Sequence, residues 1–138
     1  MLEQILLITG AVIFGVLGTI HLVYTFFSAK FDPYDPAVRT GMQATTMRIS
    51  RSTSLWNAWT GFNASHSLGA MVFALFVLLL AGLHMDFVRS APLFAWLAAA
   101  NALAWLAVGL RYWFRIPTTG LALSSACFLI AAIRLSWT

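Results

Sequence analysis

Four long apolar runs limit what this chain can fold into. An α-helix needs roughly 20 apolar residues to cross a bilayer, at a rise of about 1.5 Å per residue. Backbone groups in lipid must be satisfied internally, and the alternation of a membrane β-barrel is missing, so the runs predict transmembrane helices. In order along the chain they are Ile5–Phe27, Leu55–Leu80, Pro92–Phe114 and Leu121–Leu135.

The composition supports an integral membrane protein. Of the 138 residues, 61% are hydrophobic and 9% charged, whereas soluble domains carry about 25% charged residues. The four runs use nearly the whole chain, so no segment is left for a soluble domain. We therefore predict an all-α fold, a single bundle of four transmembrane helices over residues 1–138. The helices are expected at about residues 4–27, 54–81, 91–114 and 118–136.

The basic residues predict how the chain crosses the membrane. Six of the eight lie in the first loop or around the third, and two lie near the second loop and the C-terminus. Because cytoplasmic loops carry the excess of Lys and Arg, we expect a multi-pass protein of the cell inner membrane with both termini outside. Topology thus accounts for the +4 net charge, and no nucleic-acid partner is expected. The six are Lys30, Arg39, Arg48, Arg51, Arg111 and Arg115.

The first loop holds a second candidate element. Asp35 followed by Pro36 resembles an N-cap and first-turn pair. Apolar residues then share one side from Ala37 to Ile49, which predicts a short helix at the cytoplasmic interface; an ordinary loop with one helical turn is the alternative. Cys127 is the only cysteine, so no internal disulfide or cysteine-based metal cluster can form.

Polar side chains inside the apolar runs mark the candidate site. Trp59, Asn63 and His66 share one face of the second helix at steps of four and three residues. Counted from the cytoplasmic ends at 1.5 Å per residue, His21 lies roughly 9 Å deep, Asn63 roughly 15 Å and His66 roughly 20 Å. A polar pocket open toward the cytoplasm would gather these residues with Asn101 on the third helix and Ser124 on the fourth.

Helix packing is the competing explanation for these polar groups. Asn, His and Ser commonly form hydrogen bonds between transmembrane helices, worth about 0.6 kcal/mol each on average. Small residues also repeat every four positions on both helices, and packing through both rows would turn His21 and His66 apart. We favour inward polar faces, because a lipid-facing His or Asn is costly, and we expect one leftover row to form a subunit contact. The rows are Ala11, Gly15 and Thr19, and Gly61, Ser65 and Gly69.

The second run also carries a recognisable pattern, W-x-x-W-x-G-F-N-x-S-H-S-L-G, from Trp56 to Gly69, and G-x-x-H-L lies at Gly18–Leu22. These segments resemble those of a group of small bacterial four-helix membrane proteins of unassigned function. The resemblance covers the second helix and part of the first. It implies a four-helix membrane unit and draws attention to His21, Asn63 and His66, but it implies no activity.

The leading functional hypothesis is a protein that binds or acts on a hydrophobic molecule such as a lipid, isoprenoid or quinone. In it His21 and His66 supply acid/base or hydrogen-bonding groups, and Asn63 and Asn101 orient the polar head of the molecule. No metal ligand set is predicted, and whether the protein is an enzyme stays open. Substrate contacts are assigned to Trp56, Trp59, Asn101 and Ser124, with Arg48, Arg51, Arg111 and Arg115 holding an anionic headgroup at the mouth.

Two alternatives stay open. One is a b-type haem protein with His21 and His66 as axial ligands; the depth offset of roughly 10 Å between the two histidines argues against it. The other is a non-catalytic membrane subunit or small transporter, in which the polar residues only fix packing. The expected partners are membrane lipids or a hydrophobic small molecule, with a homo-oligomer formed through the small-residue rows.

Overall fold

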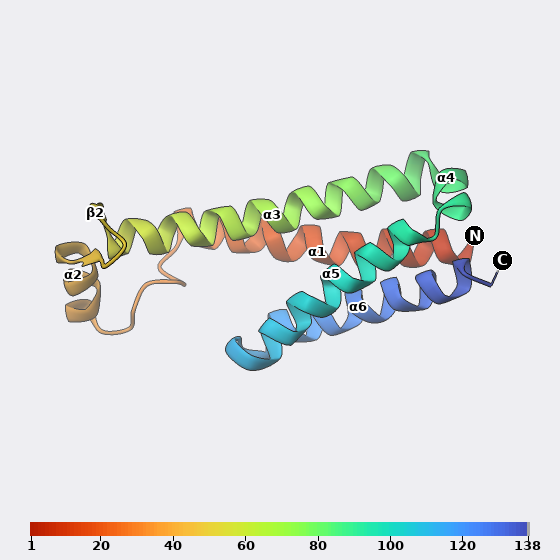
Figure 1. Ribbon diagram of the computed structural model, residues 1–138. Coiled ribbons are helices and arrows are strands. Elements are labelled where there is room, and N and C mark those ends of the chain that lie inside the picture. Colours follow the sequence, from red (N-terminus) through yellow and green to blue (C-terminus); the bar gives the residue numbers. More distant parts are fainter. Residues whose placement is uncertain (138) are drawn as a thin grey trace. The chain divides into compact units, whose positions relative to one another are not determined.

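The computed structural model describes residues 1–137, and it confirms the all-α fold class. Four helices are long and apolar enough to cross a membrane: α1, α3, α5 and α6. In chain order the elements are α1 (Leu2–Phe27), α2 (Pro36–Ala44), β1 (Thr46–Met47), β2 (Ser50–Ser54), α3 (Leu55–Leu83), α4 (Met85–Ser90), α5 (Leu93–Tyr112) and α6 (Arg115–Leu135) (Figure 1).

The chain divides into two compact units, although one domain is predicted from the sequence. The bundle unit comprises Met1–Leu17 and the chain from Ala70 on, and the loop unit comprises Gly18–Gly69. The helices α1 and α3 each contribute one part to the bundle unit and one part to the loop unit.

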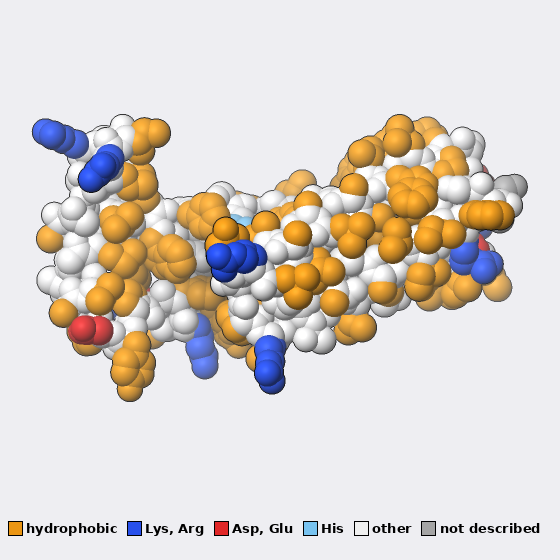
Figure 2. Space-filling view, turned by 60° about the horizontal axis from the view of Figure 1, so that its bottom comes forward, with side chains coloured by type: hydrophobic (Ala, Val, Ile, Leu, Met, Phe, Trp, Pro, Cys, Tyr) orange, Lys and Arg blue, Asp and Glu red, His pale blue; other side chains and the backbone are white. Residues whose placement is uncertain are grey.

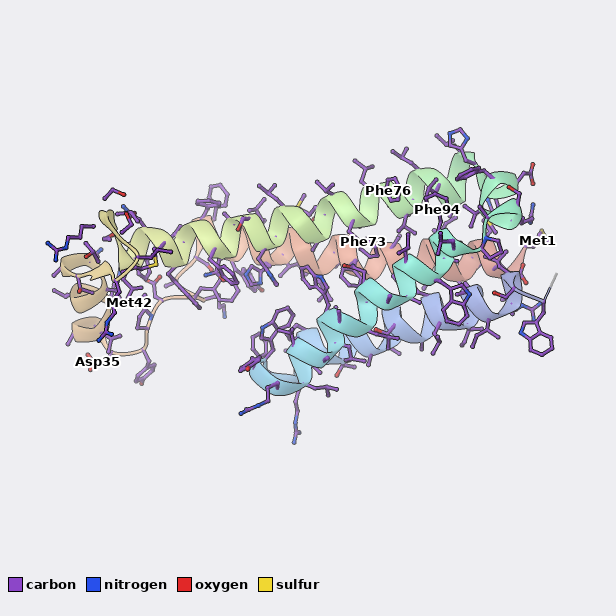
Figure 3. The ribbon with its side chains drawn as sticks, viewed as in Figure 1. Met1, Asp35, Met42, Phe73, Phe76 and Phe94 are labelled. Atoms are coloured by element: carbon purple, nitrogen blue, oxygen red, sulfur yellow. The ribbon has the colours of Figure 1, made fainter. Side chains whose placement is uncertain are left out.

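The bundle unit is built on small residues. One face of α5 buries alanines at helical spacing, namely Ala95, Ala98, Ala99 and Ala102. Such side chains let helices approach closely. Larger aromatic side chains then fill the centre: the ring of Phe14 lies 6.3 Å from that of Phe128 and 4.9 Å from that of Phe73. Figure 3 shows Phe73 and Phe76 on α3 and Phe94 on α5 in this unit.

Polar contacts tie three helix ends together in the bundle unit. Glu3 Oε1 accepts a hydrogen bond of 2.6 Å from Arg134 Nε, and Gln4 Nε2 donates one of 2.8 Å to the carbonyl of Ala81. The start of α1 and the ends of α3 and α6 therefore lie together. Glu3 near the start of the chain and Arg134 near the end of α6 therefore lie at the same end of the unit.

Two helix boundaries of the bundle unit differ from the sequence prediction. Residues 82–90 lie between the second and third predicted helices, but they contain the end of α3 and the short helix α4. The fourth helix was expected to begin at about residue 118, but α6 begins at Arg115. Pro117 is accepted there because the first N–H groups of a helix have no intrahelical partner to lose.

The loop unit confirms the predicted N-cap. Asp35 Oδ1 accepts a hydrogen bond of 2.8 Å from the amide of Ala37, and Pro36 occupies the first turn of α2 (Figure 3). The helix ends at Ala44, so the prediction that it reaches Ile49 is wrong. Thr45 is extended, with φ −112° and ψ 163°, and the β-branched Thr45 and Thr46 favour that conformation. The chain then forms a two-stranded antiparallel hairpin, β1–β2.

On the face shown in Figure 2, hydrophobic side chains are spread over the surface, with a few Lys and Arg side chains among them. Large apolar residues are exposed on every long helix, among them Phe62, Val72, Leu110 and Leu123. Large apolar side chains exposed in such number along long helices are unsuited to water and suited to lipid. The surface therefore agrees with the length and composition of the four helices in indicating a membrane protein.

Candidate functional site

The candidate site lies in the loop unit, where α1 and α3 each supply polar side chains. His21 Nε2 on α1 lies 2.9 Å from Asn63 Oδ1 on α3. Asn63 is 5% exposed, and His21 is half-buried. The structure thus brings together two of the three residues that the sequence predicts as the functional centre, across 42 positions of the chain.

The Asn63 amide has a defined orientation. Its Nδ2 atom donates a hydrogen bond of 2.8 Å to the carbonyl of Trp59, one turn earlier in α3. The amide oxygen is therefore the atom that faces His21, and because an amide oxygen only accepts, His21 must donate from Nε2. Neutral His21 is consequently held as the Nε2–H tautomer, with Nδ1 as its acceptor nitrogen.

His66 completes the group. Its ring centroid lies 5.3 Å from that of His21, with the two planes inclined at 54°. His66 also makes a stacked contact with Phe62, with the two ring centroids 6.0 Å apart. The proximity of the two imidazoles agrees with the interpretation that the polar faces of α1 and α3 point toward each other.

Sequence reasoning missed Phe31. Its ring lies over His21, with centroids 4.3 Å apart and planes inclined at 33°. Its carbonyl accepts a hydrogen bond of 3.2 Å from Trp59 Nε1. The indole of Trp59 therefore holds Phe31 in place through this hydrogen bond, and the Phe31 ring covers His21. No local pattern marks Phe31, because its hydrogen bond with Trp59 joins residues 28 positions apart.

This arrangement has the components of acid/base chemistry. An imidazole whose second nitrogen is oriented by a hydrogen-bonded partner can take up or release a proton at a chosen atom. Here Asn63 is the orienting group, Nδ1 of His21 is the acceptor atom, and His66 places a second imidazole beside it. The aromatic rings of Phe31 and Phe62 supply apolar walls of the kind that ligand sites use.

The structure places two other predicted site residues, Asn101 and Ser124, in the bundle unit. The Ser124 hydroxyl is fully buried and donates a hydrogen bond of 2.8 Å to the carbonyl of Gly10. It therefore connects α6 to α1. Asn101 lines a separate cavity, which is described below.

The remaining predicted contacts are distributed over both units. In the loop unit the guanidinium of Arg39 lies 4.7 Å from the centre of the Trp56 ring, so Trp56 holds α2. Arg48 is exposed in the turn of the hairpin, and Arg51 is exposed on β2. In the bundle unit Arg111 and Arg115 are exposed at the end of α5 and the start of α6.

The predicted depth offset between the histidines is wrong. Counting from helix ends assumed that Phe27 and Thr53 lie at one depth, but His21 is level with Asn63 through their hydrogen bond. The offset therefore gives no reason against axial haem ligation. The hydrogen bond engages Nε2 of His21 as a donor, so Nδ1 is the nitrogen of that ring that keeps a lone pair for a ligand. Axial haem ligation by the two histidines therefore stays an alternative hypothesis.

No cluster of three or more His, Cys, Asp or Glu side chains with metal-binding spacing occurs within residues 1–137. Comparisons of the chain with protein-family models, curated proteins and solved structures gave no match. The resemblance of Trp56–Gly69 to small bacterial four-helix membrane proteins therefore stays a prediction.

Proposed function

We propose that the protein is a membrane-embedded binding protein or enzyme for a hydrophobic molecule with a polar head, such as a lipid, isoprenoid or quinone. His21 and His66 contact the polar head, and Asn63 holds His21 in one tautomer. The apolar body of the molecule lies against Phe31, Phe62 and the neighbouring hydrocarbon.

One observation carries this proposal: the hydrogen bond of 2.9 Å from His21 to Asn63, with the His66 ring 5.3 Å away. Packing alone needs neither a second imidazole nor an oriented amide, since Gly, Ala and Ser suffice to associate helices. Polar groups in a membrane segment are costly and usually have a task. Three of them around one point, on two helices, therefore favour a ligand site.

The experiment separates ligand binding from packing. His66→Gln, His21→Gln and Asn63→Ala are purified in mild detergent and assayed for thermal stability. The small molecules and lipids that each variant retains are identified by mass spectrometry. A site residue should lose a specific retained molecule while the protein stays folded, whereas a packing residue should lose about 1 kcal/mol of stability and nothing else.

Two matched variants serve as controls. His84→Gln changes an exposed histidine between α3 and α4, and Asn57→Ala changes an exposed asparagine on α3. Both should behave like the unmodified protein in both assays. If the three site variants keep every retained molecule and differ from the controls only in stability, the residues serve packing, as in a non-catalytic subunit or small transporter.

We further propose that the protein is a multi-pass protein of the bacterial inner membrane with both termini outside. The meeting of Glu3 with Arg134 supports placing the two termini on one side. The six-to-two distribution of basic residues supports a cytoplasmic position for the first and third loops. Reporter fusions at the C-terminus should therefore behave as periplasmic. A cytoplasmic C-terminus would overturn the assignment.

A further inference from the structure

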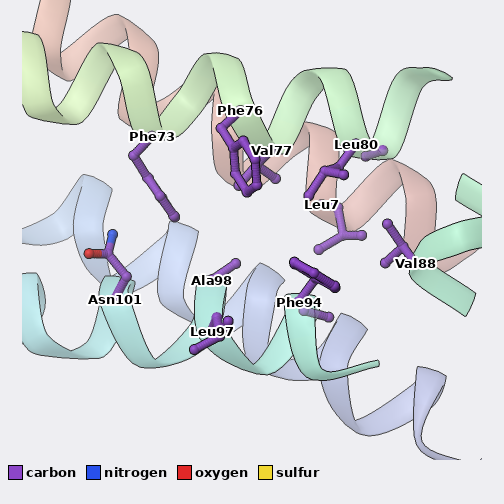
Figure 4. A pocket seen from close by; sticks show the side chains of 12 residues that line it. Leu7, Phe73, Phe76, Val77, Leu80, Val88, Phe94, Leu97, Ala98 and Asn101 are labelled. Atoms are coloured by element: carbon purple, nitrogen blue, oxygen red, sulfur yellow. The ribbon is translucent and has the colours of Figure 1, made fainter. Parts of the chain in front are cut away.

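A cavity of about 290 Å³ lies within the bundle unit, separate from the histidines. Side chains of α1, α3, α4 and α5 line it, and Figure 4 shows their arrangement. Three phenylalanine rings, Phe73, Phe76 and Phe94, form much of the wall. Asn101 is the one lining residue with a polar side chain.

The Asn101 amide lacks a partner. Its Nδ2 atom is buried, and no hydrogen-bond acceptor among residues 1–137 pairs with it. In Figure 4 the Asn101 amide projects from α5 toward α3, and Phe73 projects from α3 toward α5. A buried polar group without a hydrogen-bond partner destabilises the fold. Such a group is retained at lower cost if a ligand supplies the missing acceptor.

Water is a poor occupant of this cavity. A bound water needs two to four polar partners. Here one polar side chain faces a wall of aromatic and aliphatic residues. The volume of about 290 Å³ lies just below the range of about 300–1,000 Å³ known for ligand pockets. Both features indicate a small apolar molecule.

We propose that this cavity binds an apolar molecule, or the apolar part of one, that carries a single hydrogen-bond acceptor such as a carbonyl oxygen. The Asn101 Nδ2 group donates a hydrogen bond to that oxygen. The phenylalanine rings contact the hydrocarbon. This site uses no residue of the His21–Asn63 pair, so it stands independently of the function proposed above.

Two probes of equal heavy-atom number test the proposal: nonan-2-one, which has a carbonyl oxygen, and decane, which has none. Each is titrated into the full chain in detergent, and binding is followed by the midpoint of thermal unfolding. Nonan-2-one should bind the unmodified protein about 5- to 10-fold more tightly than decane. In Asn101→Leu, which keeps a side chain of similar size, this preference should disappear.

Further variants locate the binding. Ala98→Phe places a ring at a buried wall position and should reduce the binding of both probes. Asn57→Leu makes the same chemical change as Asn101→Leu at an exposed position and should change neither. Asn101→Ala replaces Asn101→Leu if the latter does not fold. His84→Gln, at an exposed position between α3 and α4, should also leave both affinities unchanged.

Native mass spectrometry distinguishes the natural source of the ligand. A phospholipid that the unmodified protein retains and Asn101→Leu loses assigns the carbonyl to a lipid ester. Binding of nonan-2-one with no retained lipid assigns the cavity to a free small molecule. Equal affinity of the two probes for the unmodified protein would overturn the proposal. The same conclusion would follow if Asn101→Leu kept the preference for the ketone or Ala98→Phe bound both probes normally.

Discussion

His21 and Asn63, 42 positions apart in the chain, share a hydrogen bond of 2.9 Å between Nε2 and Oδ1. The bond links α1 to α3 inside the loop unit. It also determines which nitrogen of His21 carries the proton, because the other end of the amide is held by the carbonyl of Trp59. One contact therefore serves both helix association and the orientation of a candidate base.

The energy of this bond is measurable by a double-mutant cycle. His21→Ala, Asn63→Ala and the double variant should give a coupling free energy of about 1 kcal/mol, because interhelical hydrogen bonds in membranes average about 0.6 kcal/mol and reach about 1.7 kcal/mol. Unfolding in mixed micelles supplies the values. The cycle of His21 with the exposed Asn57 is the control. A coupling near zero for both pairs would contradict the bond.

Trp59→Phe should loosen the segment that covers His21. The substitution keeps an aromatic ring but removes the indole N–H that donates to the Phe31 carbonyl. Loss of a bond worth about 0.5–1.5 kcal/mol should speed trypsin cleavage after Lys30 about 3- to 10-fold. Trp56→Phe keeps an aromatic ring beside Arg39 and should leave the rate near that of the unmodified protein. Equal cleavage rates in the two variants would show that the Trp59–Phe31 hydrogen bond does not hold this segment.

Glu3→Gln should destabilise the bundle unit. The Glu3 side chain is 11% exposed and its Oε1 lies 2.6 Å from Arg134 Nε, while the Arg134 side chain is 50% exposed. Half-exposure of the arginine weakens the pair through solvent screening, so we expect a small fall in the midpoint of thermal unfolding. Arg89→Gln breaks a pair whose acid is 97% exposed, and it should change the thermal midpoint little. A larger fall of the thermal midpoint in Arg89→Gln than in Glu3→Gln would contradict the greater contribution of the Glu3–Arg134 pair.

Gly10→Ala should disrupt packing in the bundle unit. A Cβ atom at Gly10 would lie 2.9 Å from Cε1 of the buried Phe128 ring. Overpacking of this kind costs about 1–3 kcal/mol. Gly82→Ala is the control, because a Cβ atom there meets nothing within 4 Å. The free energy of unfolding should therefore fall in the first variant and stay level or rise in the second.

Gly69→Leu tests the predicted homo-oligomer. Gly15 faces Ala74 inside the bundle unit, where a Cβ atom would lie 3.4 Å from that of Ala74. Gly61, Ser65 and Gly69 are exposed on α3, so we expect this row to contact another subunit. Light scattering and membrane crosslinking should show a smaller species for Gly69→Leu than for the unmodified protein. Monomers in both samples would show that the row faces lipid.

Much of the fold could be predicted from the sequence because it depends on local patterns. The four spanning helices follow from apolar length, which the bilayer thickness sets. The cap of α2 follows from Asp35 and Pro36, whose contacts lie within two residues. Less could be predicted of α4 and the β1–β2 hairpin, because short elements depend on what lies beside them more than on their own propensities.

The candidate site shows the same division. Sequence alone determined that His21, Asn63 and His66 are polar groups within apolar helices, since residue type and helical period suffice for that. Tertiary structure alone decided that His21 bonds to Asn63, that Phe31 covers the ring and that Asn101 faces a cavity without a partner. These relationships depend on tertiary packing. They are set by the axial position and the rotation of each helix relative to its neighbours. No local propensity encodes that alignment, because it results from the packing of whole side-chain surfaces.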